Sequence, residues 1–119
     1  KDKNTFVVTR GIDRCAWIYP MSEWNLIQKE LNQLSSLSKT NRIFLRNHLR
    51  HANILKFDSQ GRFVLPQSLI DYSSITKDVT IIGVLNKIEI WNPNLLRKID
   101  QSDEIDDQSY EQLSERVNI

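Results

Sequence analysis

The sequence predicts a mixed α+β fold in which pairs of short strands alternate with helices. Runs of β-branched and aromatic residues come in pairs on either side of short polar segments, which is typical of antiparallel hairpins. Between these pairs, apolar residues recur every three or four positions, as they do on one face of a helix. The chain has 119 residues, of which 39% are apolar. This is a modest core for a protein standing alone, so we expect further burial between subunits.

The first half of the chain contains a predicted hairpin and two predicted helices. Residues 6–9 and 16–19 form the strands, and residues 11–14 form the turn between them. Pro20 suits the start of the first helix. Its apolar stripe, most simply core, consists of Trp24, Ile27, Leu31 and Leu34. The second helix is expected from about residue 39 to 52, with Leu45, Leu49 and Ala52 on one face and Arg42, Arg46 and Arg50 on a neighbouring stripe.

The second half repeats this alternation. Residues 53–57 and 62–65 are predicted strands around the turn 58–61, and a short helix follows at 67–72. Pro66 closes the second of these strands and begins that helix. Residues 79–85 and 88–91 form another hairpin over 86–87. Pro93 then opens a C-terminal helix that runs into an acidic tail.

Charge and cysteine content limit the classes of function. Residues 1–99 hold 15 Lys/Arg against 8 Asp/Glu, whereas residues 100–119 hold 1 against 7. A body of net charge +7 suits a polyanionic partner, and a tail of net charge −6 can screen the body or compete with that partner. Mixed surface charge can also serve solubility alone.

The single cysteine, Cys15, fits a reducing cytosol. No apolar run approaches the ~20 residues of a membrane span, and the first five residues lack a signal-peptide core, so we expect a soluble cytoplasmic protein.

The two predicted hairpins form an internal repeat. An offset of 72 residues places Gly11 on Gly83, Ile18 on Ile90 and Tyr19 on Trp91, and a proline follows each copy. The strand and turn segment before the second hairpin has no counterpart within the sequence, because that counterpart would precede Lys1. We therefore expect the sequence to begin inside the first copy.

The segment from Asp58 to Pro66 carries the densest local signal. Gly61 permits a positive φ, Asp58 can bond nearby amides or hold the arginine, and Arg62 is presented at the start of the predicted strand. Such an arginine can reach a phosphate or fork onto a guanine edge. From the residues alone, an Asp–Arg pair that only stabilises the turn is the favoured alternative.

Asp58-Ser59-Gln60-Gly61-Arg62 followed by Leu65-Pro66 resembles the signature of the MraZ family. Over residues 5–95, further landmarks of that family occur in the same order, namely Thr9-Arg10-Gly11, Tyr19-Pro20-Met21 with Glu23-Trp24, and Ile88-Glu89-Ile90-Trp91. The resemblance implies an AbrB-like swapped-hairpin β-barrel built from two repeats with flanking helices, the first repeat being truncated here. The expected ranges are 1–52 for the remainder of the first repeat, 53–99 for the second and 100–119 for the acidic tail.

The resemblance also implies a function. Family members assemble as ring-shaped homo-oligomers and bind repeated promoter motifs ahead of the division and cell-wall operon, usually as repressors of their own operon. A cytoplasmic, nucleoid-associated regulator of double-stranded DNA is therefore expected, without a cofactor or a small-molecule substrate. Asp58 and Arg62 carry over as the recognition pair of the second copy, with Ser59 and Gln60 beside them, whereas the first-copy pair has no residues here.

Other residues have weaker claims to function. The candidates for phosphate contacts are Lys56, Arg42, Arg46 and Arg50, although the three arginines fit a solvated or intersubunit helix face better. His48 and His51 lack the local ligands that complete a metal site, so no metal is expected. An enzyme with Cys15 or Ser68 as nucleophile and one of these histidines as base has no supporting motif. A third hypothesis is a protein-binding or oligomerisation module of the same fold that docks through the C-terminal stripe Leu95, Leu96, Ile99, Tyr110, Leu113 and Val117.

Overall fold

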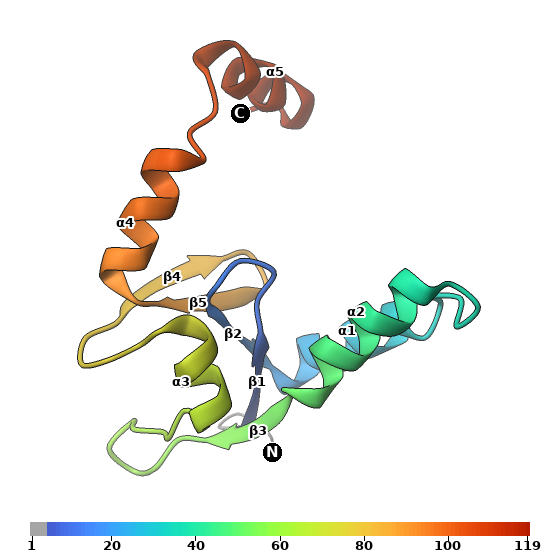
Figure 1. Cartoon of the computed structure of the whole chain (residues 1–119), viewed down its shortest axis with the longest axis vertical. Coiled ribbons are helices and arrows are strands. Elements are labelled where there is room, and N and C mark those ends of the chain that lie inside the picture. Colours follow the sequence, from blue (N-terminus) through green and yellow to red (C-terminus); the bar gives the residue numbers. More distant parts are fainter. Residues whose placement is uncertain (1–4) are drawn as a thin grey trace.

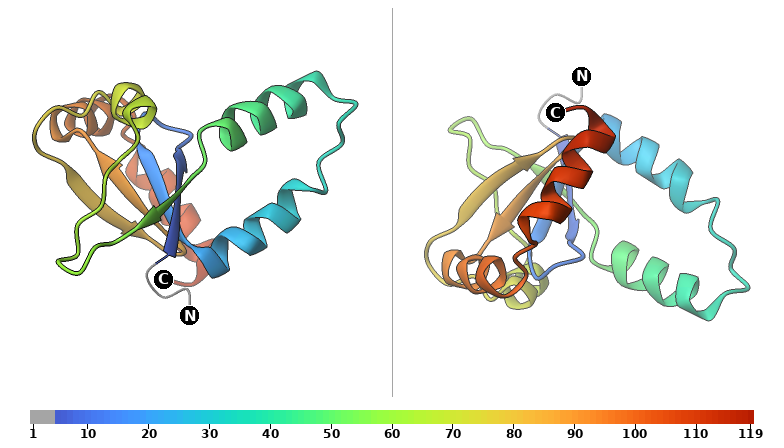
Figure 2. Two further views of the ribbon diagram at one scale, coloured as in Figure 1. Left: turned by 90° about the horizontal axis from the view of Figure 1, so that it is seen from below. Right: turned by 90° about the horizontal axis from the view of Figure 1, so that it is seen from above.

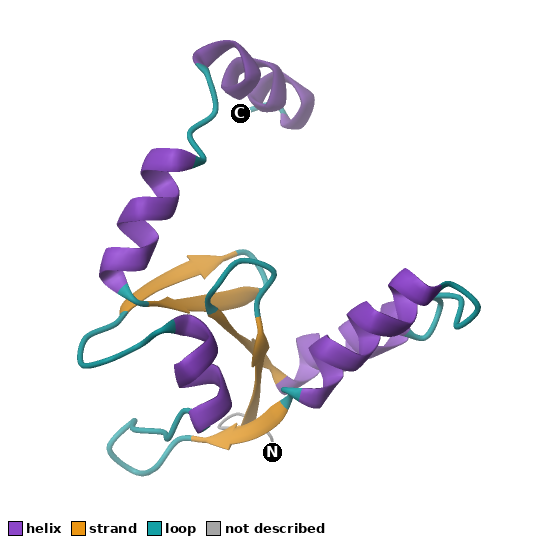
Figure 3. Cartoon of the chain, in the orientation of Figure 1, coloured by secondary structure: helices purple, strands orange, loops and turns teal. Residues whose placement is uncertain are grey.

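The computed structural model describes residues 5–119, and these form a central sheet from which helices project (Figures 1 and 3). The elements in chain order are β1 (Thr5–Arg10), β2 (Ala16–Pro20), α1 (Met21–Leu31), α2 (Lys39–Arg50), β3 (Asn53–Lys56), α3 (Gln67–Ser73), β4 (Thr80–Val84), β5 (Lys87–Trp91), α4 (Pro93–Ser102) and α5 (Asp107–Val117). The α+β class predicted from the sequence is confirmed. The expectation that the start of the chain lacks a signal-peptide core rests mainly on residues 1–4, which lie outside the residues that the structure describes.

All five strands of the described chain form one antiparallel sheet in the order β3-β1-β2-β5-β4. The two predicted hairpins, β1–β2 and β4–β5, are joined through their second strands, with Ala16 opposite Ile90. The strand β3 pairs with the outer edge of β1, where Phe6 lies opposite Leu55. The hairpin of residues 5–20 is therefore flanked on both sides by strands from residues 53–91.

The register of the sheet supports the internal repeat. Trp17 lies opposite Glu89, and these two residues are also equivalent under the offset of 72. A twofold rotation about this pair exchanges β2 with β5 and β1 with β4, which is the symmetry that a duplicated hairpin would have. The Glu89 carboxylate accepts a hydrogen bond at 3.0 Å from Nε1 of Trp17 and another at 2.9 Å from Nε1 of Trp91. One side chain thus ties the two copies together at their junction.

The core lies on both faces of β1 and β2, because successive strand residues point to opposite faces. The larger cluster consists of Val8, Ala16, Ile18, Leu55, Leu69 and Ile90. The smaller cluster, of Val7, Tyr19 and Trp24, lies on the opposite face and joins α1 to the sheet. Burial of these side chains stabilises the fold by roughly 1.5–3 kcal/mol for each large aliphatic group.

The short helix α3 fixes the segment between β3 and β4 against the first hairpin. Pro66 precedes it in the extended conformation that suits a helix entry, with φ −57° and ψ 143°. Leu69 is fully buried in the larger cluster, and the Tyr72 hydroxyl donates a hydrogen bond of 3.1 Å to the Gly11 carbonyl. The Arg10 guanidinium lies 4.4 Å from the centre of the Tyr72 ring. The turn that leads into α3 is therefore held by a helix packed on the sheet.

Each hairpin is followed by a pair of helices. We call α1 and α2 (residues 21–50) the basic helix pair, because this range holds five Lys/Arg and two Asp/Glu. We call α4 and α5 (residues 93–117) the acidic helix pair, because this range holds three Lys/Arg and seven Asp/Glu. Side-chain oxygens cap three of the four helices: Ser38 accepts from the Asn41 amide, Asn92 from the Asn94 amide and Asp106 from the Ser109 amide.

The structure corrects three details of the predicted elements. Residues 62–65 are not a strand: the Asp58 amide donates to the Arg62 carbonyl across the turn, but the pairing does not continue into a ladder, and Phe63 and Leu65 pack inward on the core. The helix α1 ends at Leu31, so Leu34 lies beyond it and is exposed. The acidic tail contains a separate helix, α5, which Asp106 begins after a break at residues 103–106.

Candidate nucleic-acid interface

The turn from Asp58 to Arg62 is organised by one carboxylate. Oδ1 of Asp58 accepts hydrogen bonds from the backbone amides of Gln60 at 2.9 Å and Arg62 at 2.8 Å. The Asp58 backbone amide donates to the Arg62 carbonyl at 2.8 Å, and the Gly61 amide donates to the Asp58 carbonyl at 3.0 Å. Gly61 has φ 77°, a conformation that side chains with a Cβ rarely adopt. The sequence therefore folds locally into a tight loop with defined geometry.

Arg62 is held in this loop while remaining open to a partner. Its Nε donates to Oδ2 of Asp58 at 2.9 Å. The Arg62 side chain is 71% exposed and the Asp58 side chain 43%. Because the bond uses Nε, the two terminal amino groups of the guanidinium remain available to form a fork. A fork of this kind matches the O6 and N7 atoms of guanine or two phosphate oxygens.

The electrostatics of the turn favour an ionised Asp58. The pKa of Asp58 is lowered, above all because the Arg62 backbone amide donates to its carboxylate, and further by the Gln60 amide and the Arg62 side chain. The carboxylate therefore remains charged at neutral pH, so that it can both close the turn and orient the arginine.

An aromatic stack supports the base of the turn. Phe57 and Phe63 flank the turn, and their rings stack with centroids 5.1 Å apart. Phe57 also stacks on Phe6 of β1 at 4.8 Å, which connects the turn to the sheet. Neither Phe57 nor Phe63 is among the predicted site residues. The signal that could have revealed this support is the placement of one phenylalanine immediately before Asp58 and one immediately after Arg62.

The other predicted turn residues lie close to the Asp58–Arg62 pair. Ser59 and Gln60 are exposed at the tip of the turn, and Lys56 is exposed at the end of β3, two residues before Asp58. Gly61 is needed for its backbone angle and not for space, since a Cβ there would meet nothing within 4 Å. Pro66 leads the chain from the turn into α3.

The arginines of α2 lie elsewhere. The basic helix pair projects from one side of the sheet, whereas the Asp58–Arg62 turn extends in a different direction (Figure 1). Nη1 of Arg42 donates to the carbonyls of Ser36 and Leu37 at 2.9 and 3.1 Å, and Nη2 of Arg50 donates to Asn47. Arg46 is exposed between them. The structure thus separates these side chains from the turn, and Arg42 holds the loop between α1 and α2.

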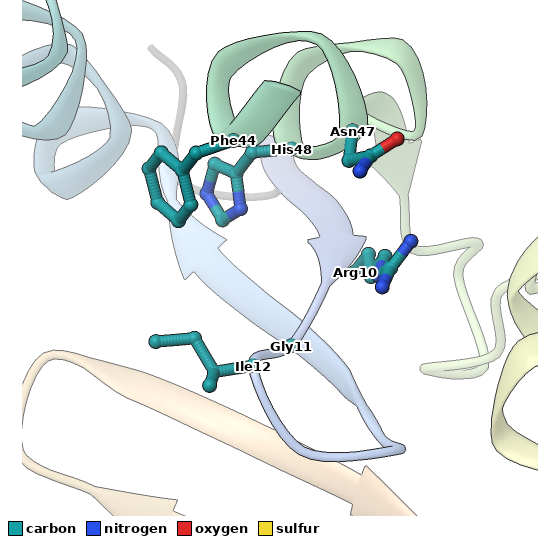
Figure 4. A pocket seen from close by; sticks show the side chains of 6 residues that line it. All are labelled: Arg10, Gly11, Ile12, Phe44, Asn47 and His48. Carbon is teal, nitrogen blue, oxygen red and sulfur yellow. The ribbon is translucent and has the colours of Figure 1, made fainter. Parts of the chain in front are cut away.

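A pocket of about 330 Å³ lies between α2 and the β1–β2 turn (Figure 4). The Phe44 and His48 rings stack in its wall at 5.4 Å, and Arg10, Gly11, Ile12 and Asn47 complete the lining. Burial, and to a smaller extent Arg10, lowers the pKa of His48, so its imidazole is neutral at pH 7. These six residues include no carboxylate or nucleophile to work with that imidazole.

The remaining candidates for catalysis or metal binding are a cysteine nucleophile and a cluster of metal-ligating side chains. Cys15 is fully buried, and its pKa is raised to about 12, chiefly by burial and then by Glu89 and Asp13, so its thiol stays protonated. Within residues 5–119, no three His, Cys, Asp or Glu side chains gather as they would around a metal ion. None of the helices in the same range is both long and apolar enough to cross a membrane.

Comparisons with known proteins agree with this two-copy α+β organisation. The family model described as "MraZ protein, putative antitoxin-like" matches the chain twice, over residues 2–47 and 48–118. The protein "Transcriptional regulator MraZ" of Clostridium tetani is 38% identical over 114 residues, which cover 96% of this chain and 78% of the relative. The protein of the same name from Natranaerobius thermophilus is 39% identical over the same shares of both chains. That of Pediococcus pentosaceus is 44% identical over 89 residues, 75% of this chain and 62% of the relative.

The class defined by the fold is therefore a protein of two related α+β copies that share one antiparallel sheet. The chain belongs to the MraZ family. The family resemblance predicted from the Asp58–Pro66 segment is confirmed. The exact ranges predicted for the two repeats and the tail, and the roles predicted for the turn residues, stay predictions.

Proposed function

We propose that this chain is a sequence-specific DNA-binding transcriptional regulator that represses its own division and cell-wall operon by binding repeated promoter motifs. Its relatives carry the name transcriptional regulator. The observation that carries the proposal is the exposed Arg62 guanidinium, oriented by Asp58 in a rigid turn, in a chain of this family. Such a regulator works in the cytoplasm, associated with the nucleoid.

In the proposed mode of binding, the turn enters a groove of the duplex. Arg62 forks onto a guanine edge, Asp58 fixes its direction, and Gln60 and Ser59 contact neighbouring groups. Lys56, two residues away, contacts a phosphate, which positions the turn without reading sequence. The arginines of α2 are a less favoured source of phosphate contacts, because the helix pair that carries them extends from the sheet in a different direction from the turn (Figure 1).

We further propose that the sheet closes into a swapped-hairpin barrel and that chains assemble into a ring. The pseudo-twofold axis at Trp17 and Glu89 supports the first part, since a strand equivalent to β3 would pair with the outer edge of β4. The second part is supported by the apolar side chains left exposed outside the sheet, among them Leu49, Tyr110 and Leu113.

The experiment that tests DNA recognition is fluorescence anisotropy with the duplex upstream of the chain's own gene and with a scrambled duplex, at two salt concentrations. We expect specific binding that weakens steeply with salt, because bound cations release counterions from the phosphates. Arg62→Ala should reduce specific binding by about 1–3 kcal/mol if Arg62 reads a base. Arg62→Lys keeps the charge without the fork and should lose nearly as much specificity.

Two controls make this result interpretable. Lys77→Ala removes an exposed positive charge outside the turn and should leave specific binding unchanged. A circular-dichroism melt shows whether each Arg62 variant keeps its fold. Equal loss of affinity for both duplexes would contradict base reading and assign Arg62 to a phosphate.

A second variant tests whether one recognition turn is sufficient. Repeating residues 53–72 immediately ahead of Lys1 adds a second Asp58–Arg62 turn at the offset of 72. We expect this chain to bind the promoter duplex more tightly than the original, because two turns on one body act together. Unchanged affinity would show that a second turn at this position does not contribute.

The alternative function is a protein-binding or oligomerisation module of the same fold without specific DNA recognition. The specific observation in its favour is α5, which is amphipathic and buries none of its residues within the described chain. If neither the original nor the extended chain distinguishes the duplexes, this alternative is preferred.

A further inference from the structure

The basic helix pair forms an open apolar groove. Its two helices diverge from the sheet and are joined at their far ends by the loop of residues 32–38 (Figure 2). Two hollows of about 370 and 280 Å³ adjoin between them and share Gln28 and Leu49. Most of the lining is apolar, including Met21, Trp24, Leu31, Leu45 and Ala52. This surface can accept an apolar helix face without rearrangement of the sheet.

The helix α5 has an apolar face that matches this groove in length. Tyr110, Leu113 and Val117 recur at the spacing of one helix face, and all three are exposed. The stripe from Tyr110 to Val117 spans seven residue steps, about 10 Å along a helix. The groove wall from Leu45 to Ala52 spans the same number of steps. In the structure α5 stands away from the basic helix pair of its own chain (Figure 1).

The charges beside these two apolar stripes are complementary. On α2, Arg42, Arg46 and Arg50 follow one another every four residues. On α5, Asp107, Glu111 and Glu115 do the same, so both rows span about 12 Å. The twelve residues of α2 carry no Asp or Glu at all. Opposite charges favour α5 over a second α2 as the occupant, because like charges at a shared interface are repulsive.

We propose that the acidic helix pair of one chain docks through α5 into the groove of the basic helix pair of a second copy. This proposal rests on the ring assembly proposed above and names the surfaces that build it. The two surfaces differ and lie on different sides of the molecule, so the contact is head-to-tail, and repeated contacts of that kind close into a ring when the rotation permits. The α2 arginines then serve assembly, and DNA recognition is left to the Asp58–Arg62 turn.

Disulfide trapping between two variants tests the docking. Leu49→Cys places a thiol in the groove and Leu113→Cys places one on α5, and both side chains are partly exposed, so neither change should disturb the core. We expect a cross-linked dimer when the two variants of the 119-residue chain are mixed and oxidised, and none from either variant alone. The buried Cys15 is present in every sample, so the unmodified chain gives the background. Leu85→Cys, on the fully exposed β4–β5 turn, is the matched control for Leu113→Cys.

Three results of this experiment would overturn the docking. Self-cross-linking of Leu49→Cys as fast as the mixture would mean that like surfaces pair. Cross-linking within single chains of the double variant, with none between chains in the mixture, would mean that α5 occupies its own groove. Assembled chains that never cross-link would mean that another surface holds the ring together.

A charge exchange gives an independent measurement that does not depend on thiol reactivity. Arg46→Glu alone and Glu111→Arg alone should each weaken self-association about tenfold in sedimentation velocity, and the two changes in one chain should restore it. Failure of the double variant to recover would contradict the charge pairing.

Anisotropy on the same samples separates the docking proposal from the proposal of DNA recognition. Chains that assemble and cross-link but do not bind the promoter duplex refute only DNA recognition. Monomeric chains that bind the promoter duplex refute the ring and the docking.

Discussion

The two hairpins of the sheet have equivalent sequences and unequal surroundings. Val7 of β1 is 3% exposed, whereas its equivalent Val79, just before β4, is 43% exposed. The β1–β2 hairpin has β3 on its outer edge and the basic helix pair against one face. The β4–β5 hairpin has a partner on one edge only within residues 5–119, and Ile81 of β4 is exposed.

The neighbours of a hairpin, more than its own residues, therefore decide how much it contributes to stability. Near the pseudo-twofold axis the two copies are still alike, because Ile18 and Ile90 are both buried in the same cluster. Away from the axis they diverge, because among the described residues the first copy alone has an outer strand. Substitutions at equivalent positions therefore test the comparison directly.

The largest effects are expected at the axis. Ile18→Ala and Ile90→Ala each remove a buried side chain from the same cluster and should each lower the free energy of unfolding by about 2–5 kcal/mol. Urea denaturation of both variants measures this loss. A mild effect at Ile90 alone would show that the second hairpin is only loosely attached to the first.

A pair of glycines should give the sharpest contrast. A Cβ at Gly11 would come within 2.8 Å of the Cys15 sulfur and 2.9 Å of the Cys15 carbonyl oxygen, whereas one at Gly83 would meet nothing within 4 Å. Gly11→Ala should therefore cost about 1–3 kcal/mol. Gly83→Ala should be neutral or stabilise by about 0.5–1 kcal/mol, because alanine loses less entropy in a strand. Thermal melts compare the two, and equal losses would contradict the packing at the first turn.

Valine truncation tests the outer edges. Val7→Ala removes two buried methyl groups and should cost about 1.5 kcal/mol. Val79→Ala, at the equivalent exposed position, should stay within about 0.5 kcal/mol of the unmodified chain. If Val79→Ala proves as costly as Val7→Ala in urea denaturation, the edge of β4 is covered in solution.

The smallest effect is expected in the pH dependence of stability. It arises in the basic helix pair, which packs on the first hairpin only. His48 is buried between Phe44 and Trp24, and its pKa in the folded state is lowered, mainly by burial. The unfolded chain therefore binds a proton below about pH 6.5 that the folded chain does not, so stability falls as the pH drops below that value. His48→Phe should flatten this dependence in melts between pH 7.5 and 5.

His51→Gln is the control for the pH series. The pKa of His51 is also lowered by burial and by Arg50 and Arg10, but this residue lies at the exposed end of α2. Its replacement should remove the smaller part of the slope. A slope that survives the loss of His48 but not of His51 would contradict the assignment.

Local patterns in the sequence were sufficient for most elements and for the candidate turn. The alternation of residues 6–9 and 16–19, the prolines at the starts of α1 and α4, and the glycine in Asp58–Arg62 each have a local physical cause. Both hairpins and the short helix α3 lie within one or two residues of their predicted places. The Asp58–Arg62 contact itself was one of the two interpretations left open.

The rest depends on contacts between residues distant in the sequence. No periodicity indicates that β3 pairs with β1 or that β2 pairs with β5, because those pairings form only when side chains of both copies share one core. The prediction of a strand at residues 62–65 was wrong for the same reason. The alternating apolar residues Phe63 and Leu65 pack against the core and do not belong to a hydrogen-bonded strand of the sheet. The break before α5 depends on Asp106, whose side chain caps the helix. In a tail rich in Asp and Glu, the sequence alone does not distinguish this capping residue from its acidic neighbours.

The position of the three tryptophans has a practical consequence for every melt described above. Trp17 and Trp91 donate to the Glu89 carboxylate at the junction of the copies, and Trp24 packs on the same sheet. The acidic helix pair contains no tryptophan, although it holds a large share of the helical residues. Tryptophan fluorescence, excited selectively so that Tyr110 of α5 does not contribute, therefore follows the sheet and α1, while far-ultraviolet circular dichroism also follows α4 and α5. A circular-dichroism transition that begins at a lower temperature than the fluorescence transition would show the helices melting before the body that carries them.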